Sequence, residues 1–156
     1  MQESKEEIIS NVVIDVLEEL AFMFGEKVDK DELPKNGAGY IQVKMGFTGP
    51  QNGEISLTVP EGVSAEIASN ILGVDLEEDE VKENNYDALK EVLNVICGQV
   101  LTSLEGEEPI FDLSVPENHA IGADEWGSML NKAEVLGFIV DEIPVLLYLE
   151  LERSQV

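Results

Sequence analysis

A carboxylate and a carboxamide stand three positions apart in the stretch DALKEVLNVICGQVLTSL, residues 87–104. If this stretch is helical, Glu91 and Asn94 are neighbours on one face, because residues three or four apart lie side by side on a helix. A carboxylate can pair with a cation, whereas a carboxamide both donates and accepts hydrogen bonds. An amide is not a strong base, so Asn94 would contribute by orienting a bound molecule.

The spacing of apolar residues indicates that residues 87–104 are helical. One apolar stripe has the helical period, and its members are Leu89, Leu93, Ile96, Val100 and Leu104. A second stripe runs along nearly the opposite side, and its members are Asp87, Glu91, Asn94 and Gly98. Glycine inside a helix costs about 1 kcal/mol relative to alanine. We therefore expect Gly98 to give clearance for another backbone or molecule that approaches this side.

Asp87, Glu91 and Asn94 each have a purely structural explanation as well. Asp87 would be favoured near a helix start by the helix dipole. Glu91 would be an ordinary surface acid, and Asn94 a buried amide whose hydrogen bonds are made inside the core. Cys97 is best explained as a small, buried apolar side chain. The period alone leaves both interpretations of the polar stripe open.

The remaining pattern predicts the elements that hold this helix in place. Two further helices have the helical period and a glycine at their end, and they cover residues 5–25 and 61–72. Alternation with a period of two predicts two hairpins, one at 39–47 with 53–59 and one at 134–140 with 145–151. It also predicts a short strand at 111–115. Residues 75–85 are strongly acidic and are predicted to be irregular, and residues 117–133 have a mixed pattern. Asn84 or Asn85 would then cap the helix at 87–104.

This order of elements predicts one α+β domain over residues 1–156. Long helices would pack on a mainly antiparallel sheet of about five to six strands. The order also suggests two pseudo-repeated halves, since Asp15–Phe22 aligns with Asp87–Asn94. In that alignment, Phe22 stands where Asn94 stands in the second half.

Composition narrows the possible partners and the compartment. The chain has 9 basic and 33 acidic residues and a net charge of −24, which disfavours nucleic acid and anionic membranes as partners. The single cysteine excludes an internal disulfide, and the first residues lack a signal-peptide pattern, so we expect a cytoplasmic protein. His119 is the only histidine, and no zinc motif, Walker loop or EF-hand appears, so we expect no metal or cofactor of its own.

Two motifs resemble the CheC/CheX/FliY family of chemotaxis phosphatases. The first is the spacing Asp87-x3-Glu91-x2-Asn94 followed by Pro116, with 21 residues between Asn94 and the proline, one fewer than the family pattern. The second is GFTGPQNGEISLTVPEGVSAEIASNILG, residues 46–73, which is similar to the family's strand, turn, strand and helix segment. The single Glu-x2-Asn motif is most similar to the CheX branch, which has one site per chain.

The resemblance implies a phosphatase that hydrolyses the aspartyl phosphate of a CheY-type receiver protein. Asn94 would hold the attacking water in line with the phosphorus, and Glu91 would form a salt bridge with the receiver's active-site lysine. Asp87 would contact the partner, and the Mg²⁺ would belong to the receiver. We further infer that Gly98 contacts the partner through the clearance that it gives. The resemblance also implies a homodimer. The alternative is a receiver-binding adaptor, or a flagellar-switch or signalling scaffold, without catalytic activity.

Overall fold

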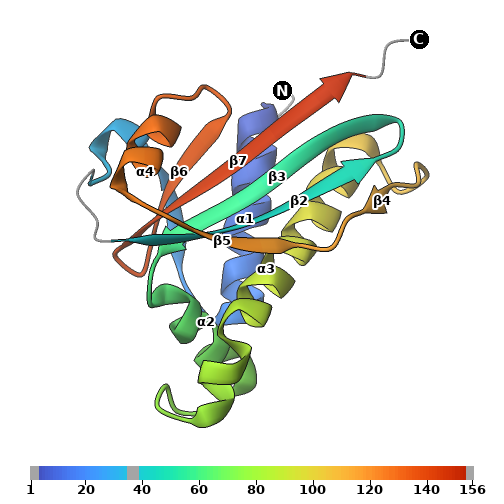
Figure 1. Ribbon diagram of the computed structural model, residues 1–156. Helices are drawn as coiled ribbons and strands as arrows, with labels where there is room; N and C mark the ends of the chain where they lie inside the picture. The colour runs from blue at the N-terminus through green and yellow to red at the C-terminus, as the bar shows by residue number, and fades with distance from the viewer. Residues whose placement is uncertain (1–3, 35–38, 154–156) are drawn as a thin grey trace.

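A computed structural model describes residues 4–34 and 39–153 of the chain. Within these residues, seven strands form one open sheet in which every pairing is antiparallel (Figure 1). The strands are β1 (Gly25–Val28), β2 (Tyr40–Thr48), β3 (Gln51–Pro60), β4 (Asp112–Leu113), β5 (Glu117–Ile121), β6 (Val135–Val140) and β7 (Ile143–Arg153). The helices are α1 (Lys5–Ala21), α2 (Val63–Leu72), α3 (Asp79–Glu105) and α4 (Ala123–Leu130), with a 3-10 turn, η1, at Lys30–Glu32. The predicted α+β class is confirmed, and the sheet has one strand more than the expected upper number.

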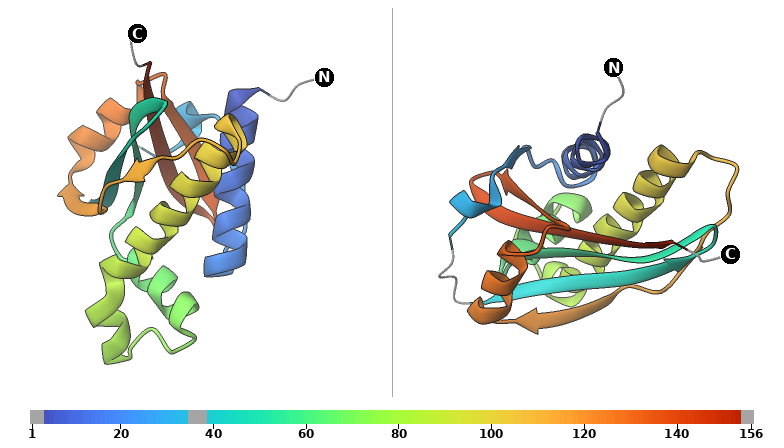
Figure 2. Two further views of the ribbon diagram at one scale, coloured as in Figure 1. Left: turned by 90° about the vertical axis from the view of Figure 1, so that its right-hand side faces the viewer. Right: turned by 90° about the horizontal axis from the view of Figure 1, so that it is seen from above.

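The helices lie in two layers, one on each face of the sheet. Helices α1, α2 and α3 cover one face, and α4 covers part of the other (Figure 2). Strand β2 follows the predicted alternation, because Val43, Met45 and Phe47 are buried under the helices while Lys44 points to the opposite face. Trp126 of α4 is fully buried in the second, smaller core. In the described part of the chain, no helix is both long and apolar enough to cross a membrane.

The sheet has an internal two-fold correspondence. Its order is β1-β6-β7-β3-β2-β4, with β5 also paired to β2, so the hairpins β2–β3 and β6–β7 meet at the centre. Each half begins with a helix, α1 or α3, and next contributes a strand that pairs with the other half's hairpin. This arrangement agrees with the predicted pseudo-repeat of the two halves.

The first helix ends earlier than predicted. It stops at Ala21, Phe22 adopts a left-handed conformation with φ of 55°, and the chain enters β1 at Gly25. Phe24, which lies within the predicted helix 5–25, is 65% exposed. Its backbone N–H donates to Asp141 Oδ1 at 3.1 Å, which ties this corner to the β6–β7 turn. Pairing with β6 therefore ends the helix although the apolar spacing continues.

The acidic segment is helical from Asp79 onward, and only residues 75–78 are irregular as predicted. Helix α3 begins at Asp79 with Glu78 as its N-cap residue, so neither Asn84 nor Asn85 is the cap. Val81 explains the extension, because its side chain is 1% exposed and joins the main core. Acidic side chains in the first turn also favour this end of the helix through its dipole.

Two further elements were missed by the pattern. Residues 117–133, which showed no clear period, contain β5 and α4. The short strand predicted at 111–115 is reduced to the two residues of β4. Both hairpins and the helix that ends at Gly73 are confirmed.

Candidate functional site

A groove of about 330 Å³ lies between α3 and the chain that joins β4 to β5. Helix α3 forms one wall with Asp87, Lys90, Glu91 and Asn94, and the other wall consists of Leu113, Ser114, Val115 and Pro116. Three members of the predicted polar stripe therefore share one groove with the proline predicted to accompany them. Residues more than 20 positions apart in the sequence are brought together here.

The helical wall is positioned by the apolar stripe beneath it. Leu89, Leu93 and Ile96 are completely buried against the sheet and the neighbouring helices. Burial of this stripe turns Glu91 and Asn94 outward, and both side chains are exposed. Exposure excludes the interpretation of Asn94 as a buried core amide.

Two structural explanations can now be decided. Asp87 lies two turns inside α3, which starts at Asp79, so the helix dipole does not explain its position. Cys97 is 1% exposed, and burial raises the pKa of its thiol to about 11. Its predicted role as a buried apolar side chain is confirmed.

The second wall is formed by a β-bulge on the outer strand. Leu113 pairs with Phe47, and pairing resumes where Glu117 meets Lys44. Between these two pairs, the three residues 114–116 face only two residues of β2, 45 and 46. A bulge of this kind bends the strand and redirects its side chains, and bulges are frequent beside active sites.

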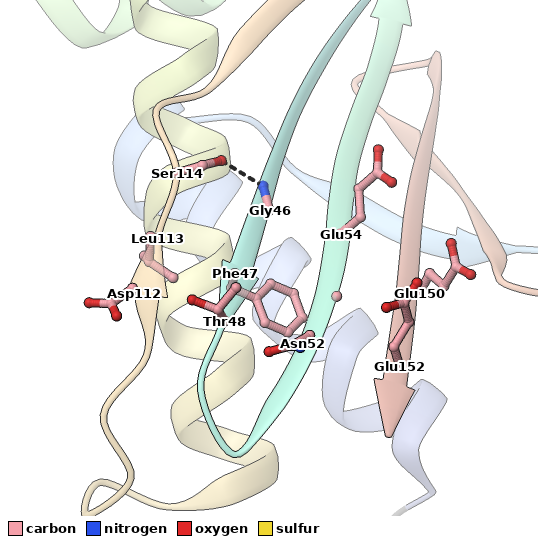
Figure 3. Close-up of a pocket in the computed structure, with 11 residues that line it drawn as sticks. Gly46, Phe47, Thr48, Asn52, Glu54, Asp112, Leu113, Ser114, Glu150 and Glu152 are labelled. Atoms are coloured by element: carbon pink, nitrogen blue, oxygen red, sulfur yellow. Dashed lines mark hydrogen bonds between the residues drawn. The ribbon is translucent and has the colours of Figure 1, made fainter. Parts of the chain in front are cut away.

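Hydrogen bonds to a single glycine hold the bulge in place. The N–H of Gly46 donates to Ser114 Oγ at 2.8 Å (Figure 3). The N–H of Ser114 donates to the Gly46 carbonyl at 2.9 Å. Pro116 has no N–H to contribute to the ladder, which suits its position in the interruption. The outcome is an exposed apolar rim, with Val115 82% exposed and Leu113 39% exposed.

Gly98 lies outside the groove. It is half-exposed on α3, one turn beyond Asn94, and a Cβ atom placed there would meet nothing within 4 Å. Packing within the chain therefore does not require a glycine at this position. Its role in contact with a partner stays a prediction.

Sequence reasoning missed four lining residues. Lys90 precedes Asn94 by four positions, so helical spacing alone could have placed it on the same face. Leu113, Ser114 and Val115 carried no such signal, because the bulge depends on pairing with β2.

The alignment that set Phe22 against Asn94 is wrong. Phe22 caps the end of α1, whereas Asn94 lies 11 residues before the end of α3. Asn11, which is exposed and lies 10 residues before the end of α1, occupies the comparable depth. The spacing around it, Ser4-x3-Ile8-x2-Asn11, repeats that of the groove, and Pro34 follows after 22 residues. The first half therefore keeps the amide but has Ile8 in place of the carboxylate.

A larger hollow of about 540 Å³ lies on the other side of the bulge. Glu54, Glu150, Glu152 and Asp112 give it a strongly acidic lining (Figure 3). It contains none of the residues predicted for the site. Within residues 4–34 and 39–153, no three His, Cys, Asp or Glu side chains are grouped so that they could hold a metal ion.

Comparisons with known proteins identify relatives of this chain. The model of the family described as chemotaxis phosphatase CheX matches residues 41–124, more than half of the sequence. A chemotaxis protein CheX from Desulfovibrio desulfuricans is similar, with a TM-score of 0.67, 19% identity and coverage of 95% of this chain and 99% of that one. No curated protein matches the chain.

Two further structures share the fold. CheX in a complex of CheX, CheY, BeF3 and Mg²⁺ from Borrelia burgdorferi has a TM-score of 0.65 and 19% identity, over 97% of this chain and 99% of that one. FliY from Thermotoga maritima has a TM-score of 0.56 and 16% identity, over 99% of this chain and 92% of that one. At these identities, the structural similarity concerns the fold.

Proposed function

Because the chain belongs to the CheX family of chemotaxis phosphatases, we propose that it hydrolyses the aspartyl phosphate of a CheY-type receiver protein. The reaction site is the groove between α3 and the bulge. The observation that carries this proposal is the common placement of Glu91, Asn94 and Pro116 in that groove. The complex that a Borrelia relative forms with CheY supports a receiver as the partner.

Asn94 orients the attacking water. Its exposed carboxamide accepts a hydrogen bond from the water and donates another to a neighbouring oxygen. Water attacks the phosphorus, the bond between phosphorus and the aspartate oxygen breaks, and the products are a carboxylate and inorganic phosphate. Such a transfer depends on positioning and electrostatic stabilisation, so one oriented amide is sufficient on this side. Mg²⁺ carried by the receiver neutralises charge on the phosphoryl oxygens.

Glu91 docks the helix on the receiver. Its carboxylate is exposed, and in the described part of the chain no ion pair engages it. It is therefore available for the receiver's active-site lysine, with a charge-assisted hydrogen bond that sets the register of α3. Asp87 extends the same edge one turn earlier.

The bulge supplies apolar contact area beside this polar helix. Leu113 and Val115 are exposed on the wall opposite Asn94, where a docked receiver would cover them. Covering them removes apolar surface from water and limits access of bulk solvent to the reacting group. Gly98 allows the partner to approach the helix, and we propose a homodimer with one such groove in each chain.

Single-turnover decay of phosphorylated CheY-type receivers tests the proposal. We expect the wild-type protein to accelerate decay and Asn94→Ala to lose that acceleration while it still binds. Gln99→Ala is the matched control, because Gln99 is an exposed amide on the same helix outside the groove. Full activity of Asn94→Ala would exclude this mechanism. Binding of wild type without acceleration, for every receiver of the organism, would favour the non-catalytic adaptor.

A further inference from the structure

Among the residues that the structure describes, Lys90 is the only basic one that lines the groove. It lies four positions before Asn94, so the two side chains are neighbours on α3. The lysine is half-buried, and its neighbours on the helix include the carboxylates of Asp87 and Glu91. A cation in this position affects which charged groups the groove can bind.

The ammonium group of Lys90 has no partner among the contacts described for residues 4–34 and 39–153. Lys5 and Lys82 also have no such contact, but both are exposed, whereas several other lysines are engaged. Lys27 and Lys44 form ion pairs at 3.2 and 2.8 Å, and Lys132 lies 5.5 Å from the ring centre of Tyr148. A half-buried lysine that forms no ion pair in the described part of the chain is available for a ligand.

The position of Lys90 indicates which kind of ligand it would bind. A phosphoryl group held for attack by the water on Asn94 lies within reach of a lysine one turn away, because the lysine stem is long and flexible. The net charge of −24 repels such a group at a distance, and a local cation offsets that repulsion where the group enters the groove. If the groove contained carboxylates as its only charged groups, it would not attract an anionic substrate.

We propose that Lys90 binds the phosphoryl oxygens of the substrate and stabilises their charge during transfer. This inference rests on the proposed function and adds a residue to it. The lysine keeps its proton and forms no covalent bond, and its ammonium acts as a point charge beside the equatorial oxygens. The groove would then recognise opposite charges with adjacent residues, Glu91 for the receiver's lysine and Lys90 for the phosphoryl group.

The test compares Lys90→Met and Lys90→Arg with Lys82→Met, a matched control whose lysine is exposed on α3 outside the groove. Single-turnover decay is measured against phosphatase concentration, and binding is measured for the receiver with and without beryllofluoride, a stable analogue of the acyl phosphate. We expect Lys90→Met to lower the catalytic efficiency about tenfold, as for loss of a hydrogen bond to a charged group. Lys90→Arg should retain most activity, and Lys82→Met should match wild type.

The binding measurement distinguishes phosphoryl recognition from general docking. We expect Lys90→Met to lose affinity for the beryllofluoride form and to keep its affinity for the unmodified receiver. Equal weakening for both forms, or behaviour identical to that of Lys82→Met, would overturn the role of Lys90. Binding requires no turnover, so this result stands even if wild type fails to accelerate decay, an outcome that would overturn the proposed function alone.

Discussion

Ser114 and Gly46 exchange two hydrogen bonds across the outer strand pair, at 2.8 Å to the serine hydroxyl and 2.9 Å to the glycine carbonyl. At this point, the two hydrogen bonds take the place of the regular ladder between β2 and its outer partner strand. The bulge that it fixes turns Val115 and Pro116 toward α3. The geometry of the groove thus depends on β2, which contributes no residue to the groove lining.

Glu91→Gln should weaken docking while the chemical step is retained. The substitution removes the charge and keeps the shape, so the concentration of phosphatase required for half-maximal decay should rise about tenfold. The salt dependence of docking should decrease as well, because one charge pair is lost. Glu83→Gln is the control, since Glu83 is exposed on the same helix outside the groove. An unchanged half-maximal concentration would contradict the docking role.

Val115→Ser should reduce affinity for the receiver without loss of stability. The side chain is 82% exposed, so its replacement removes almost no buried area from the folded protein. Affinity should fall about threefold to tenfold if the partner covers this side chain. Ile110→Ser is the control, because Ile110 is 84% exposed and does not line the groove. Titration of the receiver with each variant measures the effect, and equal affinities would show that the rim is not contacted.

Gly98→Ala should make the protein more stable and less active. Alanine fits the open space at this position and favours the helix, so the free energy of unfolding should increase by about 1 kcal/mol. A partner that approaches the helix closely would meet the added methyl group, and the half-maximal concentration in the decay assay should rise. Thermal melts and the decay assay give the two quantities. A more stable variant with unchanged activity would remove Gly98 from the contact surface.

Cys97 should make stability depend on alkaline pH. Burial raises the pKa of its thiol from 9.0 to about 11, so the unfolded chain loses this proton at lower pH than the folded protein. The contribution is complete below pH 9 and decreases as the pH rises toward 11. Denaturant midpoints for wild type and Cys97→Ala, measured across this range, should differ in slope. Parallel curves would show that the thiol titrates equally in both states.

Helical period was the most reliable guide in the sequence. It placed Glu91 and Asn94 nearly opposite the apolar stripe, and the structure shows that both are exposed, because burial of Leu89, Leu93 and Ile96 fixes the rotation of α3. Alternation likewise predicted both hairpins. The sequence patterns missed elements that form because of contacts with distant parts of the chain.

The failures have specific physical causes. The segment 75–85 resembled a solvated linker, yet Val81 packs into the core and extends α3 by two turns. Residues 22–24 continued the helical spacing, but pairing of β1 with β6 ended the helix. The second wall of the groove was predictable only at Pro116, because hydrogen bonds to Gly46 determine the rest.

Each half of the fold contributes strands that pair with the hairpin of the other half, so the two halves are interlocked. Strand β1 leaves the first half to pair with β6, and β4 and β5 leave the second half to pair with β2. Either half alone would have a two-stranded hairpin whose outer neighbour is supplied only by the other half. Such distant pairings close late and favour slow, cooperative folding. The groove on α3 is therefore assembled only when the whole chain has folded, although the residues that line it all belong to the second half.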